Sequence, residues 1–194
     1  MLEQIDKSLF LFFNSFNSPM WDKVMWIVSG RLTWLPLYIA ILVILGIKYK
    51  NKLLIIFPLL ILTVVITDQV SLHLFKNVFE RLRPCHEPSL EGLVHIVNGK
   101  CGGKFGFVSS HASNSFGIAT ISFLLMKKKW FSISILLWAS IVAYSRVYLG
   151  VHYPGDILGG TLLGLASGYL VFQVFKILDT QYLARSSFFK LRKQ

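Results

Sequence analysis

Five apolar runs constrain this chain more than any other feature of its sequence. They occupy residues 32–47, 53–75, 113–126, 130–144 and 157–177, and none contains more than one Asp, Glu, Lys or Arg. Since an α-helix needs roughly 20 apolar residues to cross a bilayer, the runs predict five membrane spans, of which 113–126 is the shortest. The chain has 194 residues, which leaves no room for a separate soluble domain. Any chemistry must therefore take place at the ends of spans and in the loops.

Composition supports a membrane protein. Charged residues make up only 15% of the chain, whereas soluble domains carry about 25%. Residues 1–30 contain two short apolar pieces around the polar stretch 14–19, and the second piece includes Trp21 and Trp26. Trp is enriched where the membrane meets water, so this region is either an interfacial segment or a broken first span. We expect an all-α, polytopic membrane helix bundle of about six helices, formed as one domain over residues 1–194.

Basic residues in the short loops indicate how the spans are oriented. They follow the first, third and fifth runs: Lys48, Lys50 and Lys52; Lys127, Lys128 and Lys129; and Arg185, Lys190, Arg192 and Lys193. Because short loops rich in Lys and Arg face the cytoplasm, these three sites are predicted on that side. The long loop 76–110 and the turn 145–156 then share the extracytoplasmic side. On a membrane protein, the net charge of +11 indicates contact with anionic phospholipids, topology signals or an anionic substrate before it indicates nucleic acid.

Basic residues also occur on the predicted extracytoplasmic side, where the charge rule does not explain them. Lys76 and Arg83 are seven residues apart, so they would share a helix face if the second span continued through them. Such a pair could clamp an oxyanion, and the planar Arg suits phosphate. The alternative is that both cations extend to lipid headgroups.

A second polar cluster, Ser109, Ser110 and His111, comes directly before the third run. Backbone N–H groups at a helix start, together with a Ser hydroxyl, can bind an anion. A His beside them can protonate a leaving oxygen near neutral pH. The alternative is simple helix capping by Ser109 or Ser110, with His111 as an interfacial residue.

A third cluster lies between the fourth and fifth runs. His152 and Asp156 are four residues apart at the expected start of the last helix, and Arg146 precedes them. A carboxylate at this spacing can accept one imidazole N–H, which leaves the other ring nitrogen free to attack. Arg146 adds a phosphate donor. The alternative is that Asp156 only complements the helix dipole, which does not explain Arg146.

The inventory of the three clusters suits phosphoryl transfer without a metal. Cations would hold the phosphate oxygens, one His would attack phosphorus, and the other would protonate the leaving group. No group of Cys, His or carboxylates has a convincing metal-ligand pattern. We therefore expect neither a metal nor another cofactor.

The order Lys-x6-Arg-Pro, Ser-x-His and Ser-Arg-x5-His-x3-Asp resembles the three-part signature of the type 2 phosphatidic acid phosphatase superfamily. These proteins are integral-membrane lipid phosphatases that need no metal. The resemblance implies that His152 is the nucleophile, forming a phosphohistidine, that Asp156 orients it, and that His111 is the general acid. It assigns phosphate binding to Lys76, Arg83, Ser109 and Arg146. The family's middle motif is usually Pro-Ser-Gly-His, whereas this chain has Val108 and Ser110 in place of the Pro and the Gly, and the departure that matters is Ser110. Ser110 is either strained, if that position needs a positive φ, or an additional hydrogen-bond donor to phosphate.

The resemblance also limits the substrate. Compact bacterial members act on undecaprenyl diphosphate, phosphatidylglycerol phosphate, phosphatidic acid or lipid A phosphates. We therefore expect a lipid phosphatase in a bacterial cytoplasmic membrane, with its site facing outward and its substrate tail in the bilayer. Two alternatives remain: a lipid phosphotransferase with the same site, and a non-catalytic lipid-binding or transport protein.

Cys85 and Cys101 are the only cysteines, and both lie in the long loop. A disulfide between them is permitted in an oxidising compartment, and it would stabilise the loop beside Arg83. Two free thiols are the alternative. A zinc site with His86 and His95 is disfavoured, because the spacings match no standard pattern.

Overall fold

The computed structural model describes residues 1–191, with side chains over residues 1–181. Residues 1–191 contain no strand, and the predicted all-α membrane bundle is confirmed. The α-helices are α1 (Leu2–Asn14), α2 (Pro19–Val28), α3 (Leu35–Tyr49), α4 (Leu53–Val70), α5 (Asn77–Phe79), α6 (Ser110–Met126), α7 (Lys129–Tyr148) and α8 (Pro154–Leu191). A π-helical segment, η2 (Ser71–Lys76), joins α4 to α5, and short 3₁₀ segments are η1 (Lys50–Lys52), η3 (Pro84–His86), η4 (Pro88–Leu90) and η5 (Val97–Gly99).

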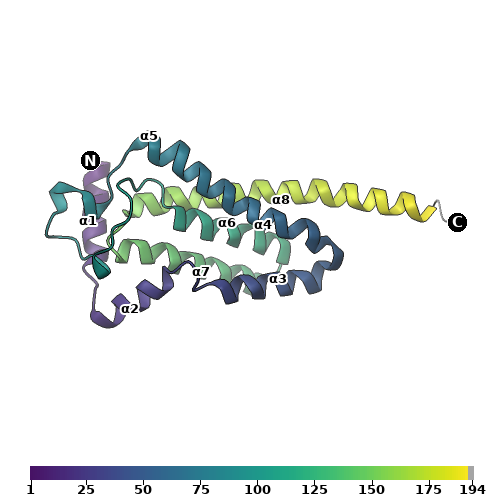
Figure 1. The fold of residues 1–194 in the computed structure, drawn as a ribbon, viewed down its shortest axis with the longest axis horizontal. Coiled ribbons are helices and arrows are strands. Elements are labelled where there is room, and N and C mark those ends of the chain that lie inside the picture. Colours follow the sequence, from purple (N-terminus) through teal and green to yellow (C-terminus); the bar gives the residue numbers. More distant parts are fainter. Residues whose placement is uncertain (192–194) are drawn as a thin grey trace.

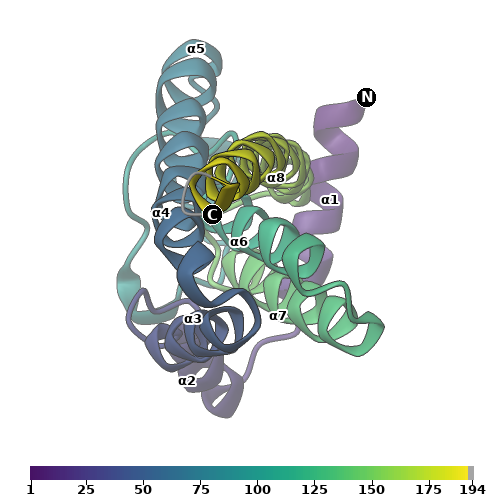
Figure 2. The ribbon, with the colours of Figure 1, turned by 90° about the vertical axis from the view of Figure 1, so that its right-hand side faces the viewer.

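The helices long and apolar enough to cross a membrane correspond to four of the five predicted spans. They form the stretches Leu35–Phe79, Lys129–Tyr148 and Pro154–Gln181. The first stretch is two spans, because the chain reverses at Lys50, where φ is 49°, and α3 and α4 form a hairpin (Figure 1). The fifth predicted span is α6, which has 17 residues and lies among α4, α7 and α8 in the interior (Figure 2).

Glycines hold α8 against α6. Gly160, Gly164 and Gly168 recur every four residues along one side of α8. A Cβ atom on Gly164 would lie 2.5 Å from the Ser113 carbonyl oxygen, and the other two positions are equally close to backbone of the partner helix. Small residues at this spacing let two helices approach closely. The close approach brings the N-terminus of α8 beside the N-terminus of α6, where the predicted site residues lie.

The two N-terminal helices are each too short to cross a bilayer alone. Helix α1 runs roughly perpendicular to the bundle and lies across one end of it (Figures 1 and 2). Its buried face includes Phe10 and Asn14, whereas Ile5, Leu9 and Phe12 are exposed. This distribution is that of a helix lying at a membrane surface, as one of the two predicted alternatives requires. Its position in a membrane stays a prediction.

The ends of the bundle differ as the loop charges predict. The basic turns at Lys50 and Lys128 lie at one end, and the loop 76–110 and the α7–α8 turn lie at the other (Figure 1). The third basic site, Arg185 to Lys193, lies outside the residues whose side chains are described. Which end faces the cytoplasm stays a prediction.

Candidate active site

The N-terminus of α6 is fixed by a serine cap. Ser109 is fully buried, and its Oγ accepts a hydrogen bond from the Ala112 N–H at 3.5 Å. Its own N–H donates to the Asp156 carbonyl oxygen at 3.0 Å, which ties α6 to the first turn of α8. The predicted capping therefore applies to Ser109. Ser110 and His111 follow in the first turn, where the helix dipole favours an anion.

Ser110 carries no backbone strain. It does not adopt a positive φ, so replacement of the family's Gly has no left-handed penalty at this position. Its Oγ accepts a hydrogen bond from Lys76 Nζ at 2.6 Å and lies 2.7 Å from Ser71 Oγ. The Ser110 side chain thus holds the Lys76 ammonium at the N-terminus of α6.

Lys76 and Arg83 do not share a helix face, because the second span does not continue as helix through both of them. The helix ends at Phe79, because Glu80 adopts a left-handed conformation with φ of 46°. Arg83 lies in the extended segment beyond, where Nε donates to the Phe105 carbonyl at 3.2 Å and Nη1 to the Cys101 carbonyl at 3.1 Å. Both cations nevertheless line the same cavity.

His152 and Asp156 form a buried pair at the start of α8. His152 Nδ1 lies 3.3 Å from Asp156 Oδ2, which also accepts the Tyr153 N–H at 3.0 Å. Burial lowers the pKa of His152 well below its usual value, and the charges of Arg83, Arg146 and Lys76 lower it further. The ring is therefore neutral at pH 7, and Nε2 is the nitrogen left for an incoming electrophile.

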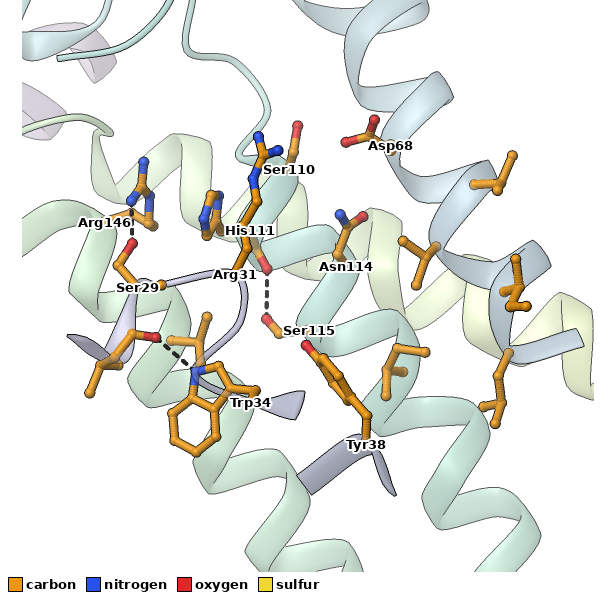
Figure 3. A pocket seen from close by; sticks show the side chains of 18 of the residues that line it. Ser29, Arg31, Trp34, Tyr38, Asp68, Ser110, His111, Asn114, Ser115 and Arg146 are labelled. Atoms are coloured by element: carbon orange, nitrogen blue, oxygen red, sulfur yellow. Dashed lines mark hydrogen bonds between the residues drawn. The ribbon is translucent and has the colours of Figure 1, made fainter. Parts of the chain in front are cut away.

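Arg146 extends from α7 toward the same cavity. Its Nη1 donates to Ser29 Oγ, and its Nε is buried with no hydrogen-bond partner among the described residues (Figure 3). Buried donors are normally satisfied, so an unpaired guanidinium N–H at a cavity indicates a place for an acceptor. A phosphate oxygen is an acceptor that Arg recognises well.

These side chains surround one cavity of about 840 Å³. Its polar end is lined by Lys76, Arg83, Ser110, His111, Arg146 and His152. Its remaining wall is largely apolar and comes mainly from α3 and α4, including Tyr38, Ile41, Phe57, Leu60 and Val64. In Figure 3, Arg146, His111 and Ser110 lie at one end and Tyr38 lies farther along. Of the predicted site residues, Ser109 and Asp156 lie behind the cavity wall rather than on it.

Several residues at the site were missed in the sequence. Arg81 donates to Asp156 Oδ1 at 2.9 Å and to Asp6 Oδ2 at 2.7 Å. Gly106 packs so closely that a Cβ atom would lie 2.9 Å from Asp156 Oδ2. Arg31 and Asn114 line the cavity. Arg81 lies inside the first motif and could have been found there, whereas no local pattern marks Asp6.

The long loop is closed by Cys85 and Cys101, which the structure joins as a disulfide with Cα atoms 5.9 Å apart. The ligand atoms of Cys85, His86 and Cys101 lie within 4.8 Å of one another. However, the disulfide removes both thiolates, and His95 instead lies 2.9 Å from Asp22 Oδ1. This arrangement does not fit a zinc site. The redox state in the cell stays a prediction.

Comparison with known proteins identifies the family. Residues 54–178 match the PAP2 superfamily. A lipid A 4′-phosphatase from Bacteroides thetaiotaomicron is 43% identical over 88% of this chain and 77% of its own. A lipid A 4′-phosphatase from Porphyromonas gingivalis is 34% identical over 94% of this chain and 78% of its own.

A solved structure agrees with these sequence relatives. The crystal structure of a transmembrane PAP2-type phosphatidylglycerolphosphate phosphatase from Bacillus subtilis superposes with a TM-score of 0.65 at 27% identity, covering 93% of this chain and 87% of that one. The fold, the cavity and the matched segment, which contains all three motifs, lead to one conclusion. The chain belongs to the PAP2 superfamily and is an enzyme of its metal-independent lipid phosphatase class.

Proposed function

We propose that this enzyme hydrolyses a phosphate monoester on a lipid A-type glycolipid, and that the reaction passes through a phosphohistidine at His152. The observation that carries the proposal is the buried His152–Asp156 pair, whose His152 lines the same cavity as three cations from three different segments of the chain. Two relatives that each match more than 80% of this chain are named lipid A 4′-phosphatases, which supports this substrate class.

The first half of the proposed reaction forms the phosphohistidine. Lys76, Arg83 and Arg146 hold the non-bridging phosphate oxygens, and the N–H groups at the start of α6 add to their field. His152 Nε2 attacks phosphorus while Nδ1–H donates to Asp156, which stabilises the imidazolium that develops. In the absence of substrate, burial and the charge of Arg146 lower the pKa of His111 to about 2, so His111 takes up its proton together with the bound phosphate dianion. It then gives this proton to the bridging oxygen as the P–O bond breaks, and the lipid leaves as an alcohol.

The second half releases phosphate. Water enters where the lipid alcohol left, and His111, now neutral, accepts one of its protons. The water oxygen attacks phosphorus, the N–P bond breaks, and inorganic phosphate and free His152 result. Were a lipid hydroxyl to attack instead of water, the same site would transfer phosphate. A non-catalytic transport protein would not need the buried His152–Asp156 pair, so we do not favour that alternative.

The apolar part of the cavity supports a lipid substrate. Side chains of α3 and α4 extend the cavity away from the cations over hydrophobic surface. An acyl chain lying there would keep its carbons out of water while the headgroup reaches His152. We place this site on the extracytoplasmic face of the bacterial cytoplasmic membrane, because the basic turns lie at the opposite end. We also propose that those turns contact anionic phospholipids.

The test is inorganic phosphate release from lipid A by purified protein in detergent with EDTA. His152→Ala is the blank, and mass spectrometry identifies which phosphate is lost. We expect the wild-type enzyme to remove the 4′-phosphate of lipid A. Undecaprenyl diphosphate and phosphatidylglycerol phosphate should be poorer substrates. Faster turnover of either of these lipids than of lipid A would make that lipid the assigned substrate instead. Activity lost in EDTA and restored by a divalent cation would contradict the metal-free mechanism.

A further inference from the structure

The carboxylate of Asp156 is held from two sides. One oxygen faces His152, and the other accepts a hydrogen bond from Arg81 Nη1 at 2.9 Å. Asp156 has no exposed surface, so it depends on such partners to stay ionised and in place. The guanidinium of Arg81 also lies 4.1 Å from the centre of the Tyr153 ring, which restrains its plane.

Arg81 is itself oriented from α1. Its Nη2 donates to Asp6 Oδ2 at 2.7 Å, and the other oxygen of Asp6 accepts the Gly155 N–H at 2.8 Å. The second contact places Asp6 at the N-terminus of α8, where a negative charge is favoured. Gly155 permits this contact, because a Cβ atom there would lie 2.6 Å from Asp6 Oδ2.

We propose that Arg81 and Asp6 are positioning residues, through which the N-terminal helix α1 completes the active site. This inference rests on the proposed function, since it concerns the histidine that the proposed mechanism uses. Asp6 draws one guanidinium nitrogen of Arg81 away from Asp156, so that Arg81 binds only one carboxylate oxygen. The other oxygen remains directed at His152. Without Asp6, Arg81 is free to chelate both oxygens of Asp156 and weaken the contact with the imidazole.

Two conservative variants isolate this arrangement. Asp6→Asn keeps an oxygen for the Gly155 N–H but offers Arg81 no carboxylate. Arg81→Lys keeps the charge but cannot reach both carboxylates in a fixed geometry. The matched control is Lys7→Gln on the same helix, because Lys7 pairs with Glu87 at 3.2 Å and touches neither His152 nor Asp156.

The experiment measures kcat and KM for release of phosphate from lipid A, together with the Tm in detergent. We expect Asp6→Asn and Arg81→Lys each to lower kcat about 10-fold or more with KM nearly unchanged. The double variant should be no slower than Arg81→Lys, because both changes act through one contact. Lys7→Gln should keep the wild-type kcat. The inference would be overturned if kcat fell in proportion to Tm in all three single variants. It would also be overturned if the fold-losses of kcat in Asp6→Asn and Arg81→Lys multiplied in the double variant.

Ligand binding separates this inference from the proposed function. Orthovanadate mimics five-coordinate phosphorus and needs a positioned His152, whereas inorganic phosphate needs mainly the cations. We expect both variants to weaken vanadate binding about 10-fold and to leave phosphate binding unchanged. If the variants lose vanadate binding but keep phosphate binding, while the wild-type enzyme cleaves no lipid, the positioning role is retained and the proposed function is rejected. If the wild-type enzyme cleaves lipid but the variants bind vanadate as wild type does, only the positioning role is rejected. If the wild-type enzyme cleaves no lipid and the variants bind vanadate normally, both proposals are rejected.

Discussion

Cations occupy both ends of the bundle, but their partners differ. At the end with the basic turns, Lys48 Nζ donates to the carbonyl oxygens of Leu125 and Met126 at 2.8 and 2.6 Å, the last residues of α6. Lys52 pairs with Asp179 at 2.6 Å. A helix C-terminus carries partial negative charge, so Lys48 complements the dipole of α6, and the Asp179 carboxylate balances Lys52. Both contacts hold helices together.

At the other end, the cavity cations have only neutral partners. Lys76 and Arg146 donate to serine hydroxyls, and Arg83 donates to backbone carbonyls. Within residues 1–181, no carboxylate forms a salt bridge with any of the three. Neutral oxygens fix a cation without cancelling its charge, so these three keep their charge for an anion. The comparison predicts that equivalent truncations at the two ends have different consequences.

The largest effect is expected for the nucleophile. His152→Ala should lower phosphate release by at least about 10³-fold, because removal of a nucleophile leaves only binding and electrostatic stabilisation. Initial rates of phosphate release measure this, with Tm in detergent as the control for folding. A variant with more than about a tenth of wild-type activity would contradict the assigned role of His152.

The next effect separates the two ends. Arg146→Ala should lower kcat/KM about 10²- to 10³-fold, since a fixed cation at the phosphate is lost. Lys48→Ala, its counterpart, should leave kcat/KM unchanged and reduce stability by about 1 kcal/mol, because it uncaps α6. Steady-state kinetics of both variants measure kcat/KM, and thermal unfolding measures their stability. Similar activity losses at the two ends would remove the distinction.

A packing change should act on stability and reach the site only indirectly. Gly164→Ala places a Cβ atom 2.5 Å from the Ser113 carbonyl, so α6 and α8 must separate. We expect a loss of about 1–3 kcal/mol in the free energy of unfolding, measured as a lower Tm in detergent. The control is Gly46→Ala, whose new Cβ meets only a flexible Leu53 side chain at 3.2 Å. An unchanged Tm for Gly164→Ala would show that the two helices are not held this closely.

A smaller effect is expected at the position that departs from the family. Ser110→Gly removes the hydroxyl that accepts from Lys76 but leaves the cation in the cavity. Activity should change by less than about 10-fold, chiefly in KM. A loss as large as that of Arg146→Ala would mean that Ser110 itself contacts the reacting phosphate.

The smallest response should be that of the His152 ring to pH. Because its folded pKa is well below the usual value, lowering the pH through 6.5 should leave the imidazole neutral and nucleophilic. Nitrogen-15 NMR of labelled histidines, with His152→Gln to assign the signal, measures this directly. Protonation of His152 near pH 6.5 would show that neither burial nor the cavity cations lower its pKa.

The sequence predicted those parts of the molecule that local pattern determines. Apolar runs located the spans, and the motif spacing singled out His111 and His152, which line one cavity, and Asp156, which contacts His152. The second span was predicted to end at residue 75. The helical stretch continues to Phe79, where the left-handed conformation of Glu80 ends it, and no apolar pattern marks that end. The contact between Asp6 and Arg81 joins residues 75 positions apart, which spacing alone does not reveal.

Detection of the phosphohistidine is the most direct test of the proposed mechanism. Wild-type protein mixed with lipid A in detergent is quenched in alkali within a single turnover, and its peptides are analysed by mass spectrometry. We expect one phosphoryl group on the peptide containing His152, absent from His152→Ala and reduced in Arg146→Ala. The Lys48→Ala variant should label like wild type. Full phosphate release with no phosphoryl group on His152, or with the group on another residue, would contradict the proposed mechanism.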